Sequence, residues 1–213
     1  MTQHTAQTLV LATRNAGKIR ELNALFAARG LTVVGLDAFP DMDDVEETGT
    51  TFEENALLKA RAAATATGCV AVADDSGLEV DALSGRPGVY SARYSEDWPE
   101  RPGESRDARN IRKLLQEMAD VPEAARTGRF VCAMAACTPD GRELCVRGVW
   151  EGRLLTAPQG HNGFGYDPLF FDAELGQTAA QMPQDVKNGR SHRGKALRLL
   201  LERWGAFMPT PRH

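Results

Sequence analysis

Two adjacent carboxylates, Asp74 and Asp75, directly follow the apolar run Cys69–Ala73. We expect that run to be a short buried strand, and α/β folds bind ligands at the carboxyl ends of such strands. Because neighbouring strand residues point to opposite faces, one acid can hold a divalent cation or a water while the other fixes the turn at Ser76–Gly77. Carboxylate oxygens suit Mg²⁺. An Asx-turn that binds nothing accounts for the same residues equally well.

The segment TRNAGK (Thr13–Lys18) places a glycine-containing turn between an expected strand and an expected helix. Such a junction collects free backbone N–H groups at the positive end of the helix dipole, which favours an anion. Thr13 and Asn15 add polar donors, and Lys18 adds a charge. The segment is not a P-loop, because GxxxxGK[ST] does not occur in the chain. Taken alone, an ordinary helix N-terminus is the simpler interpretation.

The segment GHNGFGYDP (Gly160–Pro168) has three glycines within six residues, so its backbone can approach a ligand closely. Phe164 and Tyr166 offer flat apolar surfaces, and Asp167 offers an acceptor. This combination suits a nucleobase, since stacking on an aromatic ring contributes about 1–3 kcal/mol per base. A glycine-rich turn with two core aromatics is an equally common alternative.

In the segment SHRGKAL (Ser191–Leu197), Ser191 is expected to cap a helix. His192 and Arg193 would then lie in the first turn, where cations are unfavourable unless an anion or an acceptor-rich ligand offsets them. This departure from the usual charge preference favours ligand contact.

Length and composition narrow the class of protein. The 213 residues, 42% hydrophobic and 25% charged, are typical of a globular chain. The net charge of −4 argues against a nucleic-acid binder. The chain has neither an apolar run of about 18 residues nor an apolar leader, so we expect a cytoplasmic protein with no membrane partner. The four cysteines show no CxxC spacing and are expected to be buried, reduced thiols.

The elements that must position these segments alternate as in an α/β fold. We expect a long ordered loop over 84–104, rich in glycine and proline, and a hairpin turn at Thr-Pro-Asp-Gly. Expected strands cover 9–13, 31–36, 69–73, 129–137 and 143–150. We expect one helix after the first strand, a second over 51–67, a third that begins after Ser105, and a fourth that begins after Ser191 and ends before Gly205.

Five segments together resemble the Ham1/RdgB family of inosine/xanthosine triphosphate pyrophosphatases: LATRNAGKIREL, EETGTTFEENALLKA, ADDSGLEVDALSGRPGVYSARY, GFGYDPLF and SHRGKAL. The resemblance runs from about Leu9 to Trp204 and implies one two-lobed ITPase-like domain over 1–213. Its fold would be α/β, an elongated mixed sheet flanked by helices, with a central cleft between the lobes. It further implies a homodimeric hydrolase that needs Mg²⁺ and cleaves ITP, dITP and XTP, purine nucleoside triphosphates, to the monophosphate and pyrophosphate.

Carried over to this sequence, the family pattern makes Asp75 the general base and, with Glu47, a metal ligand. Phe164, Gly165, Tyr166 and Asp167 would line the base and sugar pocket. His192 and Arg193 would meet the base edge. The phosphates would be bound by Thr13, Arg14, Asn15, Ala16, Gly17, Lys18, Ser76 and Lys187, with Arg14 pointing either outward or toward phosphate.

Base selectivity follows from hydrogen-bond polarity, because Arg193 only donates and His192 can donate, whereas adenine presents a 6-amino donor. Rejection of guanine stays unexplained, since Asp167 would attract its 2-amino group. Two other functions stay open. One is a Maf-type pyrophosphatase for modified nucleotides, and the other is a nucleotide-binding protein without catalysis.

Overall fold

The computed structural model describes residues 7–14, 19, 22–23, 26, 31–43 and 45–208. Four predicted phosphate-binding residues, Asn15, Ala16, Gly17 and Lys18, lie outside the described residues. The chain forms two compact units. The first contains Met1–Asp75, Ala133–Val146 and Leu200–His213, and the second contains Ser76–Cys132 and Arg147–Leu199. The single domain with a central cleft stays a prediction.

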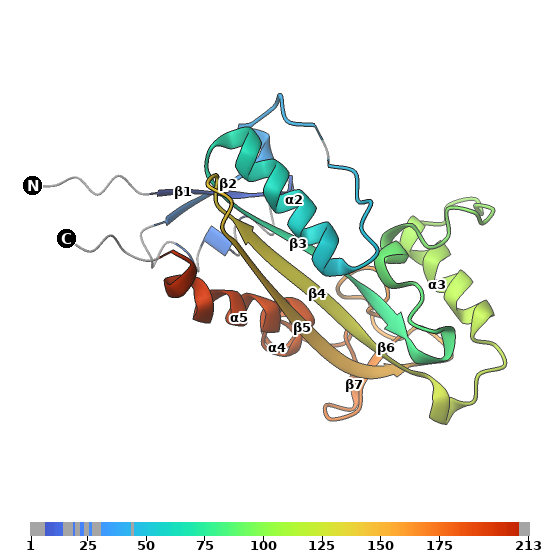
Figure 1. The fold of residues 1–213 in the computed structure, drawn as a ribbon. Helices are drawn as coiled ribbons and strands as arrows, with labels where there is room; N and C mark the ends of the chain where they lie inside the picture. Colours follow the sequence, from blue (N-terminus) through green and yellow to red (C-terminus); the bar gives the residue numbers. More distant parts are fainter. Residues whose placement is uncertain are drawn as a thin grey trace, which may run out of the picture. The chain divides into compact units, whose positions relative to one another are not determined.

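The strands form one mixed sheet in the order β2-β1-β3-β4-β5-β6-β7 (Figure 1). β1 runs parallel to β2 and to β3, whereas β6 is antiparallel to both β5 and β7. A mixed sheet with flanking helices confirms the predicted α/β class. The strands are β1 (Gln7–Leu11), β2 (Leu31–Gly35), β3 (Val70–Val80), β4 (Thr127–Cys137), β5 (Glu143–Leu154), β6 (Phe170–Asp172) and β7 (Gln177–Thr178).

The helices begin and end at the residues that local chemistry favours. In α2 (Phe52–Thr67), Thr51 and Glu54 form a capping box, and Gly68 ends the helix at φ 65°. In α3 (Arg106–Glu117), the Ser105 hydroxyl accepts from the Ala108 N–H. Among the described residues, further elements with defined bounds are α4 (Gln184–Arg190), α5 (His192–Phe207) and the 3₁₀ helices η1 (Leu36–Ala38), η2 (Asp81–Leu83), η3 (Gly88–Arg93) and η4 (Glu123–Ala125).

The core of the first unit combines β1 with small and aromatic side chains. Leu9, Val10 and Leu11 are buried. α2 contacts β1 and buries an alanine face, which allows close approach of the helix. Of the helix expected after β1, the described residues include Phe26, whose ring packs edge-on against Trp204 with centroids 4.8 Å apart.

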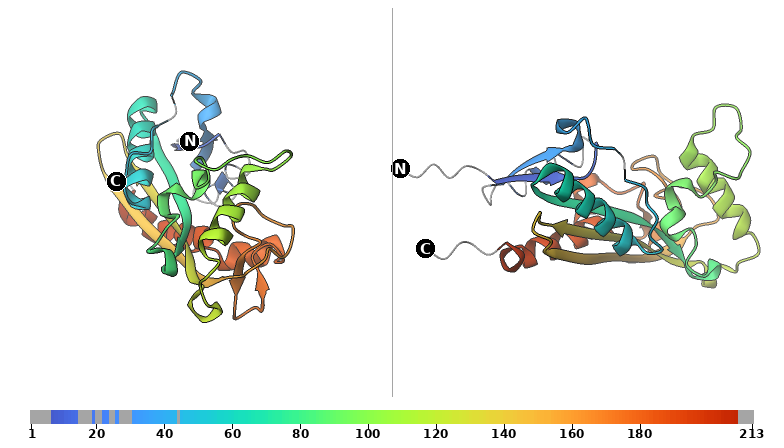
Figure 2. Two further views of the ribbon diagram at one scale, coloured as in Figure 1. Left: turned by 90° about the vertical axis from the view of Figure 1, so that its right-hand side faces the viewer. Right: turned by 45° about the horizontal axis from the view of Figure 1, so that its top comes forward.

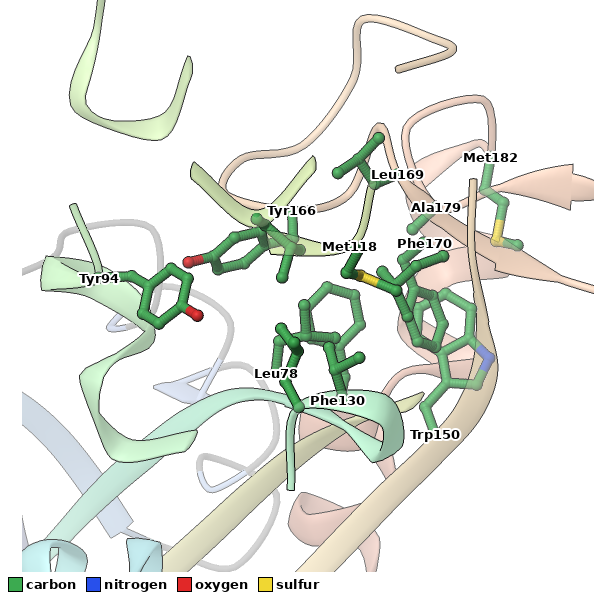
Figure 3. Packing of buried hydrophobic residues seen from close by; sticks show 14 residues of the cluster. Leu78, Tyr94, Met118, Phe130, Trp150, Tyr166, Leu169, Phe170, Ala179 and Met182 are labelled. Atoms are coloured by element: carbon green, nitrogen blue, oxygen red, sulfur yellow. The ribbon is translucent and has the colours of Figure 1, made fainter. Parts of the chain in front are cut away.

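The second unit has its own aromatic core (Figure 3). Phe130 packs against Phe170 at 4.4 Å between ring centroids, and Trp150 contacts Phe170 at 4.9 Å. The Trp150 indole N–H also donates to the buried Asp172 carboxylate. α3 packs against η3 within this unit, and the two lie side by side in Figures 1 and 2.

β3 is longer than predicted. The expected strand ended at Ala73 and turned at Asp74–Gly77, but the strand continues through both acids to Val80. Leu78 and Val80 are fully buried, and their burial favours extension of the strand over a turn. Two further expectations need smaller corrections, since the loop over 84–104 contains η3 and α5 continues past Gly205 to Phe207.

The cysteines agree in large part with the expectation. Cys132 and Cys137 are buried, Cys69 and Cys145 are half-buried, and none of the four, all among the described residues, forms a disulfide. Burial raises the pKa of the Cys137 thiol to about 11. Within the described ranges, no helix is long and apolar enough to cross a membrane.

Leu114→Ala should lower the free energy of unfolding by about 2–5 kcal/mol, because Leu114 is 0% exposed in the core of the second unit and the variant leaves a cavity. Urea unfolding followed by circular dichroism measures the change. The matched control on α3 is the exposed Gln116→Ala, which should stay near wild type. Equal losses in both variants would contradict this assignment of the core.

Candidate functional site

Asp75 is a nearly buried carboxylate, 9% exposed, held by an asparagine from α2. The Asn55 amide nitrogen donates to Asp75 Oδ2 over 3.1 Å. Asn55 is itself oriented, because its Oδ1 accepts from the Gly49 N–H at 2.8 Å. The carboxylate of Asp75 therefore has a defined orientation rather than a choice of rotamers.

Lys59 connects Asp75 to a second acid. Its ammonium lies 2.6 Å from Glu47 Oε1 and 3.6 Å from Asp75 Oδ1. Burial by itself lowers the pKa of Lys59, but the charges of Asp75 and Glu47 outweigh burial and hold this pKa above its ordinary value. One permanent cation therefore lies beside both carboxylates that the sequence predicts as metal ligands.

The N-terminal predicted residues are described only in part. Thr13 is half-buried, and its carbonyl accepts from the Leu36 N–H at 3.0 Å. Arg14 is exposed and donates to the Met42 carbonyl at 3.0 Å.

The loop over 163–167 is built around two carboxylates of the second unit. Asp167 is buried, and its Oδ2 accepts from the Phe164 N–H at 2.9 Å and from the Lys187 ammonium at 2.5 Å. Gly163 has φ +78°, and a Cβ there would collide with the Asp167 carboxyl. The Gly165 N–H donates to Asp107 at 2.7 Å.

The two aromatic rings of this loop have different environments. Phe164 is 65% exposed, with the Lys187 ammonium 5.3 Å and the Arg193 guanidinium 5.9 Å from its ring centroid. The Tyr166 ring instead joins the core (Figure 3), and its hydroxyl donates to the Ser91 carbonyl at 2.9 Å. Burial raises the pKa of Tyr166 strongly. Phe164 is thus the aromatic of this loop that is available for stacking.

Ser191 joins α4 to α5. Its N–H donates to the Lys187 carbonyl and ends α4, while its hydroxyl accepts from the Gly194 N–H and begins α5. The predicted cap is therefore confirmed. A Cβ at Gly194 would collide with the Asn188 carbonyl, so the close passage of the two helices requires glycine.

His192 and Arg193 lie in the first turn of α5, as expected. The His192 ring stacks on Phe130 with centroids 4.9 Å apart. An Arg193 guanidinium nitrogen lies 3.5 Å from Ser76 Oγ. Arg193 therefore contacts two residues predicted to bind substrate, Ser76 and Phe164.

Asn55 and Lys59 were not predicted to have a role in the site. The sequence feature that could have indicated them is their spacing of four residues, which puts both side chains on one face of α2. Asp107 was also missed, and only the fold brings it to Gly165, 58 residues away.

The chain matches the Ham1 family over residues 9–203. It is 66% identical over 203 residues to a protein of Nitratidesulfovibrio vulgaris named dITP/XTP pyrophosphatase, with 95% of this chain and 98% of that protein covered. A protein of the same name from Geobacter sulfurreducens is 51% identical over 197 residues, covering 92% of this chain and 96% of that protein.

Solved structures agree with this match. The Staphylococcus aureus Ham1 protein superposes with a TM-score of 0.84 at 39% identity, covering 95% of this chain and 100% of that one. A HAM1 protein from Coxiella burnetii gives 0.85 at 38% identity, covering 94% and 99%. A family match over almost the whole length, together with relatives of this identity, shows that the chain belongs to the Ham1 family.

Proposed function

We propose that this protein hydrolyses deaminated purine nucleoside triphosphates, ITP, dITP and XTP, to the monophosphate and pyrophosphate. The observation that carries the proposal is the buried Asp75 carboxylate, oriented by Asn55 and sharing the Lys59 ammonium with Glu47. Relatives named dITP/XTP pyrophosphatase at 66% and 51% identity support the same activity.

Glu47 and Asp75 would hold a magnesium ion. The donor set fits, because both residues offer carboxylate oxygens and already face a common cation, Lys59. Across the part of the chain that the structure describes, no group of three or more His, Cys, Asp or Glu could hold a metal. Mg²⁺ commonly takes one or two carboxylates and completes its shell with waters and substrate phosphates. When bound, the ion would neutralise phosphate charge and make a water more acidic.

Asp75 would act as the general base. Asn55 fixes one of its oxygens by a hydrogen bond, which keeps the carboxylate in one orientation. The carboxylate accepts a proton from the attacking water, whose oxygen forms a bond to the α-phosphorus. The bond from that phosphorus to the bridging oxygen breaks, and pyrophosphate leaves with the electron pair. Charge neutralisation and positioning supply most of the rate in such transfers.

Thr13, Arg14, the segment 15–18 and Ser76 would bind the phosphates. The phosphate role expected of Lys187 has less support, because its ammonium is paired with Asp167 and both side chains are buried. Lys187 instead stabilises the loop that carries Phe164.

Phe164 would stack on the purine, and His192 and Arg193 would present donors to its 6-oxo group. A site built on such donors can reject a mispaired amino group by roughly 10⁴–10⁵-fold. Asp167 is buried and paired with Lys187 and the Phe164 N–H, which argues against the expected attraction of the guanine 2-amino group by its carboxylate.

The Maf-type alternative is not favoured, since the relatives found are named dITP/XTP pyrophosphatase. Magnesium dependence, a homodimer and a cytoplasmic location remain proposals that the family resemblance implies. Sedimentation of the purified chain tests the dimer directly.

Incubation with ITP should release IMP and pyrophosphate, because attack falls at the α-phosphorus. Asp75→Asn should lower kcat by about 10²–10⁴-fold through loss of the base. Chromatography of the products and a thermal melt of the variant check both statements. The control Asp120→Asn, which alters an exposed carboxyl, should keep the wild-type rate. Release of IDP and phosphate would disprove the reaction class, and tight ITP binding without turnover would favour the non-catalytic alternative.

Lys59→Met should destabilise the fold by about 1–3 kcal/mol, because it removes an ammonium that lies 3.6 Å from the nearly buried Asp75 carboxylate. Mg²⁺ should then raise the Tm of the variant more than that of wild type, since the ion binds native carboxylates. Melts with Mg²⁺ and with a chelator measure both effects.

Arg61→Met on the same helix is the matched control. Arg61 pairs with Glu143 in a partly exposed ion pair, so Arg61→Met should lower the free energy of unfolding by no more than about 1 kcal/mol. The difference in stability between this variant and wild type should not depend on Mg²⁺. If Mg²⁺ shifts the Tm of both variants equally, Glu47 and Asp75 are not the ligands.

The rate at saturating Mg²⁺ should rise between about pH 6 and 9 as the attacking water loses its proton more readily. Lys59 does not produce this rise. Asp75 and Glu47 hold its folded pKa above the ordinary lysine value, so its stabilising charge is complete throughout this pH range and is lost only as the pH rises through the raised pKa. A stopped assay of kcat against pH tests this, and a flat profile would argue against water deprotonation as the limiting event.

A further inference from the structure

Asp107 in the first turn of α3 is directly bonded to the loop that carries Phe164. Its Oδ2 accepts from the Gly165 N–H at 2.7 Å, across 58 residues of sequence. A short hydrogen bond to an ionised acceptor is stronger than one between neutral groups. None of the roles assigned above to substrate, metal or base requires this contact.

This hydrogen bond affects the orientation of the Phe164 ring, because that orientation depends on the backbone conformation at Phe164. Phe164 is 65% exposed, so apolar packing does little to fix its ring. Two carboxylates instead anchor the peptide groups on either side of the residue. Asp167 accepts from the Phe164 N–H at 2.9 Å, and Asp107 accepts from the N–H of the following residue. Together they set the direction in which the Phe164 side chain leaves the chain.

The glycine at 165 makes the second anchor necessary. Gly165 has φ +59°, and a Cβ there would meet nothing within 4 Å, so backbone conformation rather than space favours glycine. A glycine also permits other orientations of the peptide that precedes it. Asp107 selects one of them by offering an acceptor on one side.

α3 is a firm support for that acceptor. Asn110, on the same helix face as Asp107, donates from its amide nitrogen to the Ser91 carbonyl at 3.2 Å. The Tyr166 hydroxyl donates to the same carbonyl at 2.9 Å. The residue after Gly165 is therefore tied to α3 through a second, buried route.

We propose that Asp107 is a positioning residue that fixes the Phe164–Gly165 peptide and so presents the Phe164 ring in the orientation that stacks on the purine. The inference rests on the proposed function, in which this loop receives the base. Asp107 contacts no reacting atom, so its loss should weaken substrate binding and leave the chemical step nearly unchanged.

Kinetics with ITP and Mg²⁺ test the positioning role. Asp107→Ala should raise KM about tenfold and change kcat less than about twofold, the effect of losing one charge-assisted hydrogen bond in binding. Asp107→Asn keeps an acceptor oxygen and should restore KM to within about threefold of wild type. A wild-type KM in the alanine variant, or an asparagine variant as impaired as alanine, would overturn the proposal.

Asp107 also lies at the N-terminus of α3, where an acid stabilises a helix by its charge alone. Ser105→Ala controls for that effect, because it removes the cap of the same helix and leaves the Asp107 acceptor in place. The control should lower the Tm without raising KM. If it raises KM as much as Asp107→Ala at the same Tm loss, helix stability accounts for the effect and positioning does not.

Amide hydrogen exchange at Gly165, measured by NMR without nucleotide, is independent of activity. The Gly165 N–H should be protected in wild type, Asp107→Asn and Ser105→Ala, and should exchange faster in Asp107→Ala. Equal exchange in wild type and Asp107→Ala would overturn the positioning role. A wild-type protein that does not hydrolyse ITP would instead overturn the proposed function, even with the exchange pattern intact.

Discussion

A nearly buried carboxylate needs hydrogen-bond donors and a nearby cation, and the first unit supplies both to Asp75. Only 9% of the residue is exposed, so its charge depends on hydrogen bonds and a nearby cation. Asn55 and Lys59 supply these from one face of α2. That face is positioned by the start of the helix at Thr51, and the Gly49 N–H in turn orients Asn55. The chemistry proposed for Asp75 therefore depends on where one helix begins.

The second unit uses the same chemistry for a different purpose. Asp107 and Asp167 accept from backbone N–H groups beside Phe164, and Lys187 neutralises Asp167. These carboxylates organise a loop and leave recognition to the exposed ring. Ordering such a loop before the ligand arrives lowers the entropy lost on binding, which favours affinity without new contacts.

The fold was predictable wherever the signal was local. Thr51 and Gly68 cap the two ends of α2, and Ser105 caps the start of α3. Such caps can be predicted because they depend on residues next to the helix ends. The continuation of β3 was not predictable, since Asp-Asp-Ser-Gly has the composition of a turn and only the burial of Leu78 and Val80 favours a strand.

In the candidate site, the family resemblance named individual residues but could not show their pairing. Lys187 was expected to bind phosphate, and the structure pairs it with Asp167, twenty residues away. Tyr166 was expected in the base pocket and lies in the core. Such pairings depend on tertiary contacts between distant segments, which no periodicity or spacing encodes.

Ser191 has a consequence for how this chain can vary in length. One residue ends α4 and begins α5, so no flexible loop separates Lys187 from Arg193, two cations beside the Phe164 ring. Each residue inserted in a helix rotates the rest of that helix by about 100°, so an insertion here would turn Arg193 away from that ring. The exposed tip of the hairpin at 139–141 carries neither of these cations and can absorb extra residues. Insertions and deletions should therefore accumulate at the hairpin and be excluded from the junction of the two helices.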